Sequence, residues 1–214
     1  ALPQRLAELR QSGWLEDLSA IGASNRPRAV EGSYMPCFLA GDSLGQALAL
    51  TLDVPFYQVS HQQGHLAAAA WSAGRLDLLE RPMLAWHLSG GTTELLYVEP
   101  DGVNVAAQRI GGTSDISAGQ LIDRTGVLLG LDFPAGKAVD QLGRDQIGLK
   151  FPVKLNDLTF SLSGMENKMR AMAERGDAPA QICGFVLETV ADVVRRTTQA
   201  ALAQYPGVPV LCFR

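Results

Sequence analysis

A strand that runs directly into a helix constrains the fold of this chain more than any other stretch. Positions 56–59 read FYQV, which is typical of a short strand. Ser60 and Gln63 follow as an S-x-x-Q capping box, which predicts that a helix begins there. His61 and His65 then lie one turn apart on one face of this helix. They could bind one metal ion or only hydrogen-bond to their neighbours, and the spacing leaves both interpretations open.

The segments before this junction alternate between strand and helix. Residues 18–23 have the apolar character of a short buried strand, and residues 38–52 carry a helical apolar pattern. Gly41 and Gly45 within that helix would permit a close neighbour. The order strand, helix, strand, helix predicts an α/β fold.

The composition excludes several classes of protein. The 214 residues, 47% of them hydrophobic, can bury a core in one large domain or two small lobes. Three scattered cysteines (Cys37, Cys183 and Cys212) argue against a disulfide framework and for a reducing compartment. No apolar run approaches the ~18 residues of a membrane-spanning helix, so we expect a cytoplasmic protein with no membrane partner. Since the net charge is −4, a nucleic-acid partner would need a local basic patch or a second protein.

A change of character near Leu88 predicts two lobes with a cleft between them. Residues 1–87 form the expected first lobe and residues 88–214 the second. The chain opens on Ala1 within a helical pattern and closes on Arg214 within a strand pattern. We therefore expect a fragment that is incomplete at both ends.

Two apolar strands, predicted at residues 82–88 and 93–98, are joined by a glycine-rich turn. The turn consists of Ser89, Gly90, Gly91 and Thr92. Two glycines and hydroxyl groups in such a hairpin expose backbone N–H groups, which can hold a phosphate. A hairpin turn without a ligand is the alternative interpretation.

A helix is predicted from Thr113–Asp115 to about Leu129, and one of its faces is unusual. Along this face recur Gly119, Asp123, Gly126 and Gly130, at steps of four, three and four. Each glycine costs a helix roughly 1 kcal/mol relative to alanine, which suggests that something approaches the backbone closely. Asp123 could then accept hydrogen bonds from a ribose. Tight packing between elements, with Asp123 on a wet edge, is the alternative.

The last third of the chain is predicted to be mostly helical. Ser163 and Glu166 form a second capping box, which predicts another helix start. A long helix to about Tyr205 and a closing strand follow.

Four stretches, taken in order, resemble one family. They read HQQGHLAAA from His61, LSGGTTELL from Leu88, SDISAGQLIDRTGVLLGLDFPAG from Ser114 and FSLSG from Phe160. The chain thus resembles the TsaD-like threonylcarbamoyl-adenosine (t6A) synthase family, also called the glycoprotease or O-sialoglycoprotein endopeptidase family. The sequence of residues 24–41 differs from the corresponding family segment and suggests a divergent bacterial paralogue.

The resemblance implies an actin-like or Hsp70-like ATPase fold of two lobes, with nucleotide and metal in the cleft. Such proteins bind ATP or threonylcarbamoyl-AMP. They transfer the threonylcarbamoyl group to N6 of adenosine 37 in tRNA. They also work with small partner proteins, so the resemblance implies a paralogous same-fold partner and a small ATPase subunit.

The same resemblance implies roles for particular residues. His61 and His65 would bind iron or zinc. The hairpin from Ser89 to Thr92 would contact phosphates. Asp123 and Gly136 would contact the ribose and the base.

Departures from the family pattern bear on activity. Gln63 stands where the family often has glutamate, and Thr92 where histidine or asparagine is common. Ala135 interrupts a P-G-G turn. Family members also begin with a phosphate-binding loop and end with a further asparagine and a metal-binding aspartate, which lie outside this sequence. Two histidines alone leave a catalytic metal short of its usual three protein ligands.

Three functions are therefore considered. The first is a metal-dependent threonylcarbamoyl transferase, for which the sequence nominates no general base. The second is a non-catalytic nucleotide-binding paralogue that acts as an assembly partner, which the departures favour. The third is a metallopeptidase. It is disfavoured because a zinc-protease helix reads H-E-x-x-H, whereas Gln62 and Gln63 cannot ionise.

Overall fold

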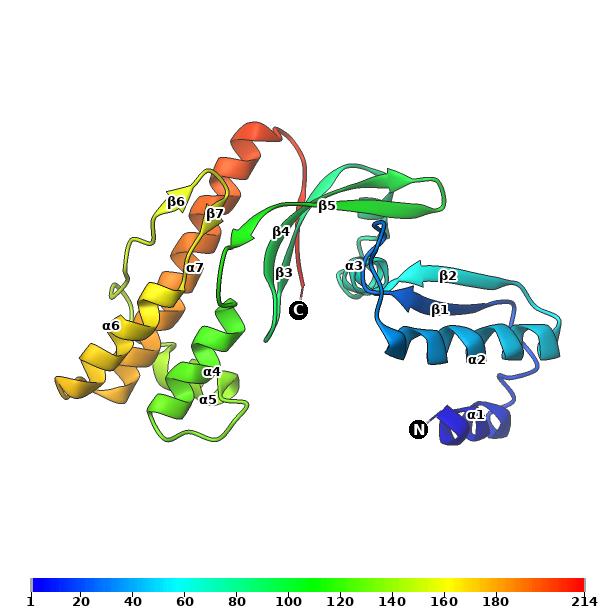
Figure 1. The fold of residues 1–214 in the computed structure, drawn as a ribbon, viewed down its shortest axis with the longest axis horizontal. Coiled ribbons are helices and arrows are strands. Elements are labelled where there is room, and N and C mark those ends of the chain that lie inside the picture. The colour runs from blue at the N-terminus through cyan, green and yellow to red at the C-terminus, as the bar shows by residue number, and fades with distance from the viewer. Residues whose placement is uncertain (1, 214) are drawn as a thin grey trace. The chain divides into compact units, whose positions relative to one another are not determined.

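The first unit of the chain, Ala1–Ala68, is built on a parallel pair of strands joined by a helix. In the computed structural model, which describes residues 2–213, its elements follow in the order α1, β1, α2, β2 and the start of α3 (Figure 1). Their bounds are Leu2–Gln11, Ile21–Arg26, Pro36–Leu52, Phe56–Ser60 and His61–Ser72. This confirms the strand, helix, strand, helix order that the sequence predicted.

A glycine lets α2 lie close to these strands. A Cβ atom at Gly45 would come within 2.7 Å of the Phe56 ring, so the close neighbour that the sequence indicated is present. At Gly41 a Cβ atom would meet nothing within 4 Å. Packing within the described chain therefore explains the glycine at position 45 but not the one at position 41.

A six-stranded mixed sheet organises the second unit, Ala69–Arg214, after the short helix η1 (Leu76–Glu80). Its strands lie in the order β6-β7-β5-β4-β3-β8. Strands β3 to β5 form an antiparallel meander, whereas β8 joins β3 and β7 joins β5 in parallel. In chain order their bounds are Met83–Leu88, Thr93–Asp101, Asn104–Thr113, Leu155–Asn156, Thr159–Phe160 and Val210–Phe213.

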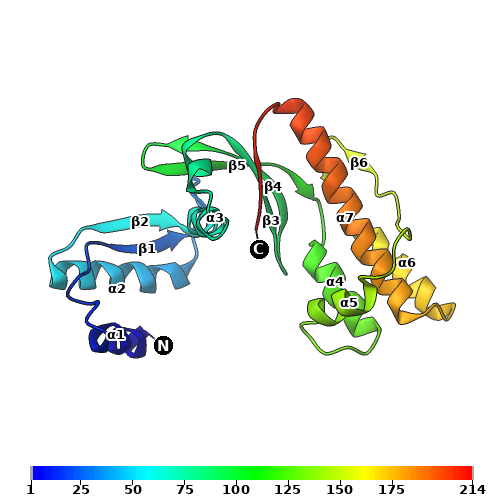
Figure 2. The same ribbon diagram turned by 180° about the vertical axis from the view of Figure 1, so that it is seen from behind.

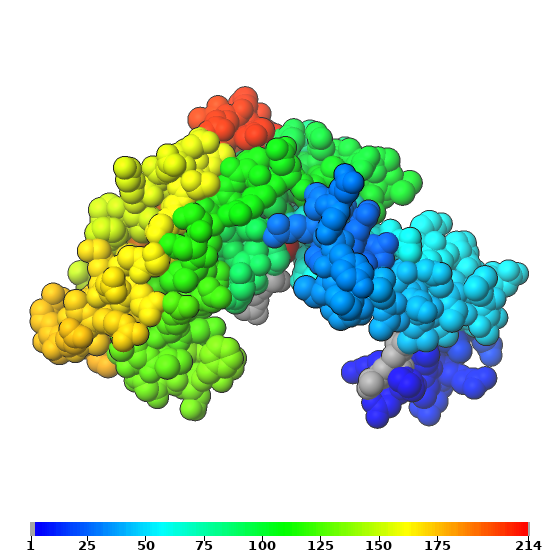
Figure 3. All heavy atoms as spheres, viewed as in Figure 1, coloured from blue at the N-terminus to red at the C-terminus, as the bar shows by residue number. Residues whose placement is uncertain are grey.

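Four helices complete this unit (Figure 2). In order, α4 to α7 span Ala118–Leu128, Gly136–Gly143, Ser163–Glu174 and Pro179–Gln204. The longest, α7, contacts each of the other three, and α4 lies beside α6 (Figure 3). No helix within residues 2–213 has the length and apolar character needed to cross a membrane.

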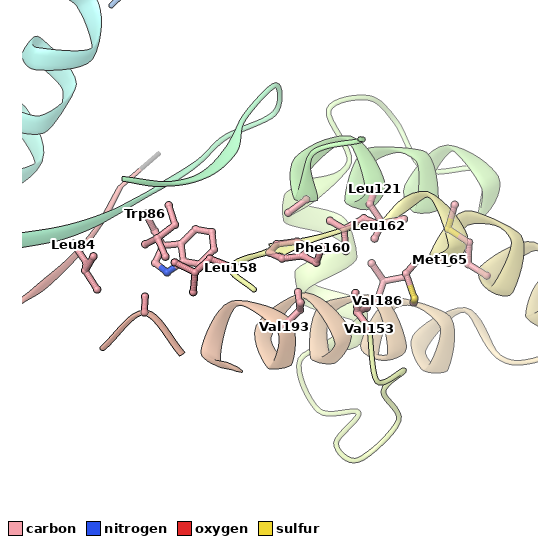
Figure 4. Close-up of a cluster of buried hydrophobic side chains, with 14 of the residues drawn as sticks. Leu84, Trp86, Leu121, Val153, Leu158, Phe160, Leu162, Met165, Val186 and Val193 are labelled. Carbon is pink, nitrogen blue, oxygen red and sulfur yellow. The ribbon is translucent and has the colours of Figure 1, made fainter. Parts of the chain in front are cut away.

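The core of the second unit joins the sheet to the helices (Figure 4). Its buried side chains include Leu84, Trp86, Leu121, Val153, Leu158, Phe160, Leu162, Met165, Val186 and Val193. The Trp86 indole N–H donates to the Thr198 hydroxyl at 2.8 Å, which ties β3 to α7.

The chain is thus a mixed α/β protein. The actin-like two-lobe fold and the lobe boundary between residues 87 and 88 stay predictions.

Helix α4 begins later than the sequence indicated. Its cap is Ser117, whose hydroxyl accepts a hydrogen bond from the Gln120 N–H at 3.0 Å. In return, the Gln120 side chain accepts one from the Ser117 N–H at 3.1 Å. The predicted start at Thr113–Asp115 is wrong, because Thr113 ends β5 and the chain turns before the cap.

Asp115 instead caps α6 from a distance. Its carboxylate accepts hydrogen bonds from the Ser161 hydroxyl at 2.5 Å and from the N–H groups of Leu162 and Ser163 at 2.8 and 3.3 Å. The predicted capping box of Ser163 with Glu166 is wrong, since no side-chain cap within α6 forms. Burial raises the pKa of Asp115, but the hydrogen bonds from Ser161 and Leu162 lower it by more, so the pKa lies below its ordinary value.

Replacing Asp115 with asparagine should destabilise the protein. A neutral amide cannot replace the charged acceptor of these bonds, so the free energy of unfolding should fall by about 1–3 kcal/mol near neutral pH. Because the folded-state pKa is lowered, this stability is present above about pH 4 and is lost as the pH falls further. Urea denaturation at about pH 7 and about pH 3 should therefore show a smaller difference between wild type and Asp115→Asn at the lower pH.

The exposed Asp145, which makes no hydrogen bond or ion pair with other described residues, offers a matched control. Asp145→Asn should leave the unfolding free energy within about 0.5 kcal/mol of wild type. An equal loss in both variants, or a loss from Asp115→Asn that does not depend on pH, would contradict the role of Asp115.

Candidate functional site

The histidine pair lies on the first turn of α3, in the first unit. The capping box is confirmed: the Gln63 N–H donates to the Ser60 hydroxyl at 3.2 Å, and the Gln63 side chain accepts from the Ser60 N–H at 2.7 Å. The His61 and His65 rings meet edge-on, with their Nε2 atoms 3.0 Å apart. The cap fixes the helical turn that brings both imidazoles together.

This pair fits two ligands of one metal ion. Zinc binds a histidine nitrogen at about 2.0–2.1 Å, so two such nitrogens must lie within about 4.2 Å of each other. Burial, and then the charge of His61, lower the pKa of His65, which favours the neutral form that a metal requires. The 3.0 Å separation also suits a hydrogen bond between the rings, so both interpretations stand. Residues 2–213 contain no group of three or more histidine, cysteine, aspartate or glutamate side chains that could hold a metal.

The glycine-rich turn joins β3 to β4 in the second unit and leaves two N–H groups open. The Ser89 N–H donates to the Thr92 carbonyl at 2.8 Å, and the Thr92 N–H donates to the Ser89 hydroxyl at 3.0 Å. The N–H groups of Gly90 and Gly91 find no acceptor in the described part of the chain. A Cβ atom at either glycine would meet nothing within 4 Å. Packing therefore does not require glycine at these positions, whereas a ligand close to the backbone would.

Helix α4 packs its first turn against this hairpin. The Ser117 hydroxyl, besides capping α4, donates to the Gly90 carbonyl at 2.7 Å. A Cβ atom at Gly119 would lie 2.5 Å from the Ser89 carbonyl oxygen and 2.6 Å from the Gly90 Cα atom. Only glycine fits at position 119 while the hairpin backbone stays in place.

Packing within the protein also explains the other glycines of this helix. A Cβ atom at Gly126 would lie 2.1 Å from that of Ala135. Gly130 follows the helix with a φ of 77°, a conformation that favours glycine. The close approach to the helix backbone is therefore confirmed for Gly119 and Gly126, and in both cases the neighbour is the protein itself. A ligand at Asp123 stays a prediction.

Asp123 connects α4 to the turn before α5. Its Oδ1 atom accepts a hydrogen bond from the Ala135 N–H at 2.9 Å. Its Oδ2 atom has no hydrogen-bond partner among residues 2–213 and is available to a ligand hydroxyl group. Gly136 begins α5 beside Ala135, and a Cβ atom there would reach only Ile122, at 4.0 Å.

Asp123 and Gly90 line one pocket of about 750 Å³ in the second unit. Its lining residues are Gly90, Gln120, Asp123, Arg124, Val127, Leu128, Phe133, Glu166 and Arg170. This volume suits a ligand of the size of a nucleotide. Ser89, Gly91 and Thr92 belong to the same hairpin as Gly90, whereas Gly136 is not part of this lining.

A charged cluster in this pocket was not predicted from the sequence. Arg124 donates to one Glu166 oxygen at 2.5 Å, and Arg170 donates to the other at 3.3 Å. The hydrogen bond from Arg124 lowers the pKa of Glu166; burial opposes this shift, and Arg170 adds to it. The spacing of Glu166 and Arg170 on one helix could have signalled an ion pair. Arg124 lies 42 residues from Glu166, a separation that no local pattern reveals.

The sequence of this chain is similar to the sequences of known proteins. The sequence profile of the family described as TsaD, tRNA N6-adenosine threonylcarbamoyltransferase, matches residues 9–213. The chain belongs to this family. Two proteins named tRNA N6-adenosine threonylcarbamoyltransferase, from Streptococcus pneumoniae (strain ATCC 700669 / Spain 23F-1) and Streptococcus suis (strain 05ZYH33), are 32% and 33% identical to it over 201 residues. Each alignment covers 89% of this chain and 56% of the relative, so the chain spans about half the length of these curated relatives.

Two alanine substitutions separate packing from ligand binding among the glycines of this TsaD-family chain. Gly119→Ala should lower the free energy of unfolding by about 1–3 kcal/mol, because the obstructing atoms belong to the hairpin backbone. Gly90→Ala should change it by no more than about 0.5 kcal/mol, since the space there is open. Urea denaturation measures both.

The same two variants should differ in ligand binding. If the hairpin holds a phosphate of ATP, Gly90→Ala should keep its fold yet bind ATP about tenfold more weakly, measured by isothermal titration calorimetry, because a methyl group would stand between the backbone and that phosphate. A Gly90→Ala variant that binds ATP as wild type does would contradict the phosphate role of the hairpin.

Proposed function

We propose that this chain carries the nucleotide-binding part of a tRNA N6-adenosine threonylcarbamoyltransferase, which moves a threonylcarbamoyl group from threonylcarbamoyl-AMP to N6 of an adenosine in tRNA. One observation carries the proposal. Two features meet at the pocket lined by Gly90 and Asp123. One is the hairpin, with its open N–H groups at Gly90 and Gly91, and the other is the Asp123 oxygen that has no partner among the described residues. Membership of the TsaD family supports the reaction class.

The pocket offers a separate group for each part of the nucleotide. The N–H groups of Gly90 and Gly91 would hold phosphate oxygens. Arg124, which is paired with Glu166, lines the same pocket. Asp123 Oδ2 would accept hydrogen bonds from ribose hydroxyl groups, while Ala135 holds its other oxygen in place. The base would lie against apolar side chains of Val127, Leu128 and Phe133.

These groups would favour transfer by stabilising the departing phosphate. As adenosine N6 attacks the carbamoyl carbon, the bond from that carbon to the phosphate oxygen breaks and negative charge returns to AMP. Backbone N–H groups aimed at that charge lower the barrier because they are already oriented before the reaction. The proposal assigns no side chain as general base.

We further propose that His61 and His65 hold a resident iron or zinc ion. When bound, such an ion supplies Lewis-acid and template chemistry for carbonyl and phosphate oxygens. The two imidazoles would contribute two nitrogen ligands from one helical turn, fixed by the Ser60–Gln63 cap. We also propose tRNA, a paralogous same-fold subunit and a small ATPase subunit as partners, and the cytoplasm as the location.

Two other functions are weaker candidates. The departures at Gln63, Thr92 and Ala135 favour a non-catalytic nucleotide-binding paralogue. The metallopeptidase alternative lacks a base, because Gln62 and Gln63 are buried amides, and the second of them caps α3.

A transfer assay tests the proposed function. Full-length protein, supplied with the proposed paralogous and ATPase subunits, threonylcarbamoyl-AMP and unmodified tRNA, should form threonylcarbamoyladenosine. Asp123→Asn should lower kcat/KM by about 10- to 100-fold, the range expected for a lost hydrogen bond to a charged group. Asp145→Asn should be indistinguishable from wild type. Nucleotide binding by the wild-type protein without any product would contradict the transferase and favour the non-catalytic paralogue.

A metal analysis tests the histidine pair. His61→Ala and His65→Ala should each lower the iron or zinc content of the purified full-length protein by about tenfold or more, because each removes a direct ligand. His87, which stacks on Phe213 with ring centres 4.8 Å apart, provides the control. His87→Gln should keep the wild-type metal content, measured by inductively coupled plasma mass spectrometry. Unchanged metal in both alanine variants would rule out the pair as ligands.

A further inference from the structure

A cluster of positive side chains gathers on α7 of the second unit, outside the pocket described above. At its centre is Asp192, whose side chain is only 8% exposed. Its carboxylate accepts hydrogen bonds from Lys150 at 3.0 Å, Arg195 at 3.0 Å and Arg196 at 2.8 Å. The bond from Lys150 lowers the pKa of Asp192, burial opposes it, and the two arginines add to the lowering, so the carboxyl is ionised at neutral pH. One negative charge therefore faces three positive ones.

The segment that leads to β6 is held along α7 and extends the cluster. The Phe151 N–H donates to the Thr189 hydroxyl of α7 at 2.9 Å. The Arg196 guanidinium donates to the Val153 carbonyl at 2.5 Å. Lys154, which is exposed, follows directly. The lysines of this segment therefore lie beside the arginines of α7.

A fifth cation reaches the segment from α6. The Lys168 ammonium lies 4.1 Å from the centre of the Phe151 ring. The basic face, as we define it, consists of Lys150, Lys154, Lys168, Arg195 and Arg196. Even with the half-buried Glu188 counted beside Asp192, it carries three positive charges in excess, in a chain whose net charge is −4. This is the local basic patch that a nucleic-acid partner of so acidic a chain would require.

Two cations of the basic face, Lys150 and Arg195, are both accessible and held in position. The side chains of Lys150 and Arg195 are 47% and 56% exposed, while Asp192 fixes their charged ends. Side chains that are already ordered lose less conformational entropy when they bind. An anion with several charges at close spacing is the ligand that such a face suits.

We infer that the basic face binds the phosphate backbone of the RNA substrate. The inference rests on the proposed function, in which tRNA accepts the transferred group. Clustered lysines and arginines hold a nucleic-acid backbone without reading its sequence, and they fix its position relative to the protein.

The basic face lies across one helix from the nucleotide pocket. Glu166 and Arg170 of α6 line the pocket, whereas Lys168, between them in sequence, reaches Phe151. Residues two positions apart do not share a helix face, so Lys168 and the pocket residues lie on different faces of α6. Helix α6 thus contributes residues both to the pocket and to the basic face.

Binding to unmodified tRNA at several salt concentrations tests the inference, with the full-length protein and fluorescence anisotropy. The double variant Lys154→Gln, Arg195→Gln removes two cations but keeps Asp192 and the Arg196 contact to the backbone. Its affinity should fall about tenfold near 0.1 M salt. The slope of log K against log salt should become shallower by about 1.5, which is roughly 0.7–0.9 for each lost phosphate contact.

Arg81→Gln provides the matched control, because Arg81 is a half-exposed cation that pairs with Asp77 away from this face. Its tRNA affinity and salt slope should equal those of wild type. If Arg81→Gln weakened tRNA binding equally, the effect would come from the net charge of the protein and not from the basic face, and the inference would be overturned.

The remaining outcomes separate this inference from the proposed function. If wild type transfers the group to tRNA and the double variant binds tRNA equally well, the basic face is not the RNA site, although the function stands. If the double variant instead loses an acidic protein partner while its tRNA affinity is unchanged, the face belongs to that partner. The exposed Ile147 and Leu149 would then contribute to the protein interface. Wild-type protein that neither binds nor modifies tRNA would overturn the proposed function itself.

Discussion

The contact between the first turn of α4 and the hairpin before β4 is the interaction on which the candidate site depends. The Ser117 hydroxyl donates to the Gly90 carbonyl, and the Ala118 N–H donates to the Thr93 hydroxyl at 2.8 Å. Both bonds cross from helix to hairpin, so the position of the open N–H groups depends on where α4 begins. Gly119 makes this approach possible, because any Cβ atom there would strike the hairpin backbone.

Structure set by neighbours in sequence was predicted well. The S-x-x-Q box at Ser60 forms the two reciprocal hydrogen bonds that define a capping box. Helix α2 and strand β2 lie within two residues of their predicted bounds, whereas β1 begins at Ile21, three residues later than predicted, and is only partly buried. The start of α4 was placed too early, because Thr113, Ser114 and Asp115 also have cap chemistry. Only the fold reveals that Thr113 is still paired in β5 and that Ser117 is the cap.

Structure set by distant partners was not predicted. Asp115 takes over the cap of α6 from more than forty residues away, so the local pattern at Ser163 was misleading. The glycines of α4 were noticed because glycine is costly in a helix. Their neighbours, the hairpin backbone and Ala135, could not be predicted from the spacing of residues along the helix. The basic face was missed for the same reason, since its members come from three separate segments. Asp123 and Gly90 were nominated from the order of the motifs, and both line one pocket, while their contacts with a ligand stay predictions.

The hairpin, α4 and α5 behave as one linked system. Ser117 joins the hairpin to α4, and Asp123 joins α4 to the turn at Ala135 where α5 begins. A ligand that immobilises the hairpin must therefore also make local unfolding of both helices less frequent. Ordering these helices costs conformational entropy, which reduces the net free energy of ligand binding. It follows that a substitution far along α4 can weaken ligand affinity while every residue that touches the ligand is unchanged. Slower amide hydrogen exchange in α4 and α5 would be the signature of an occupied hairpin.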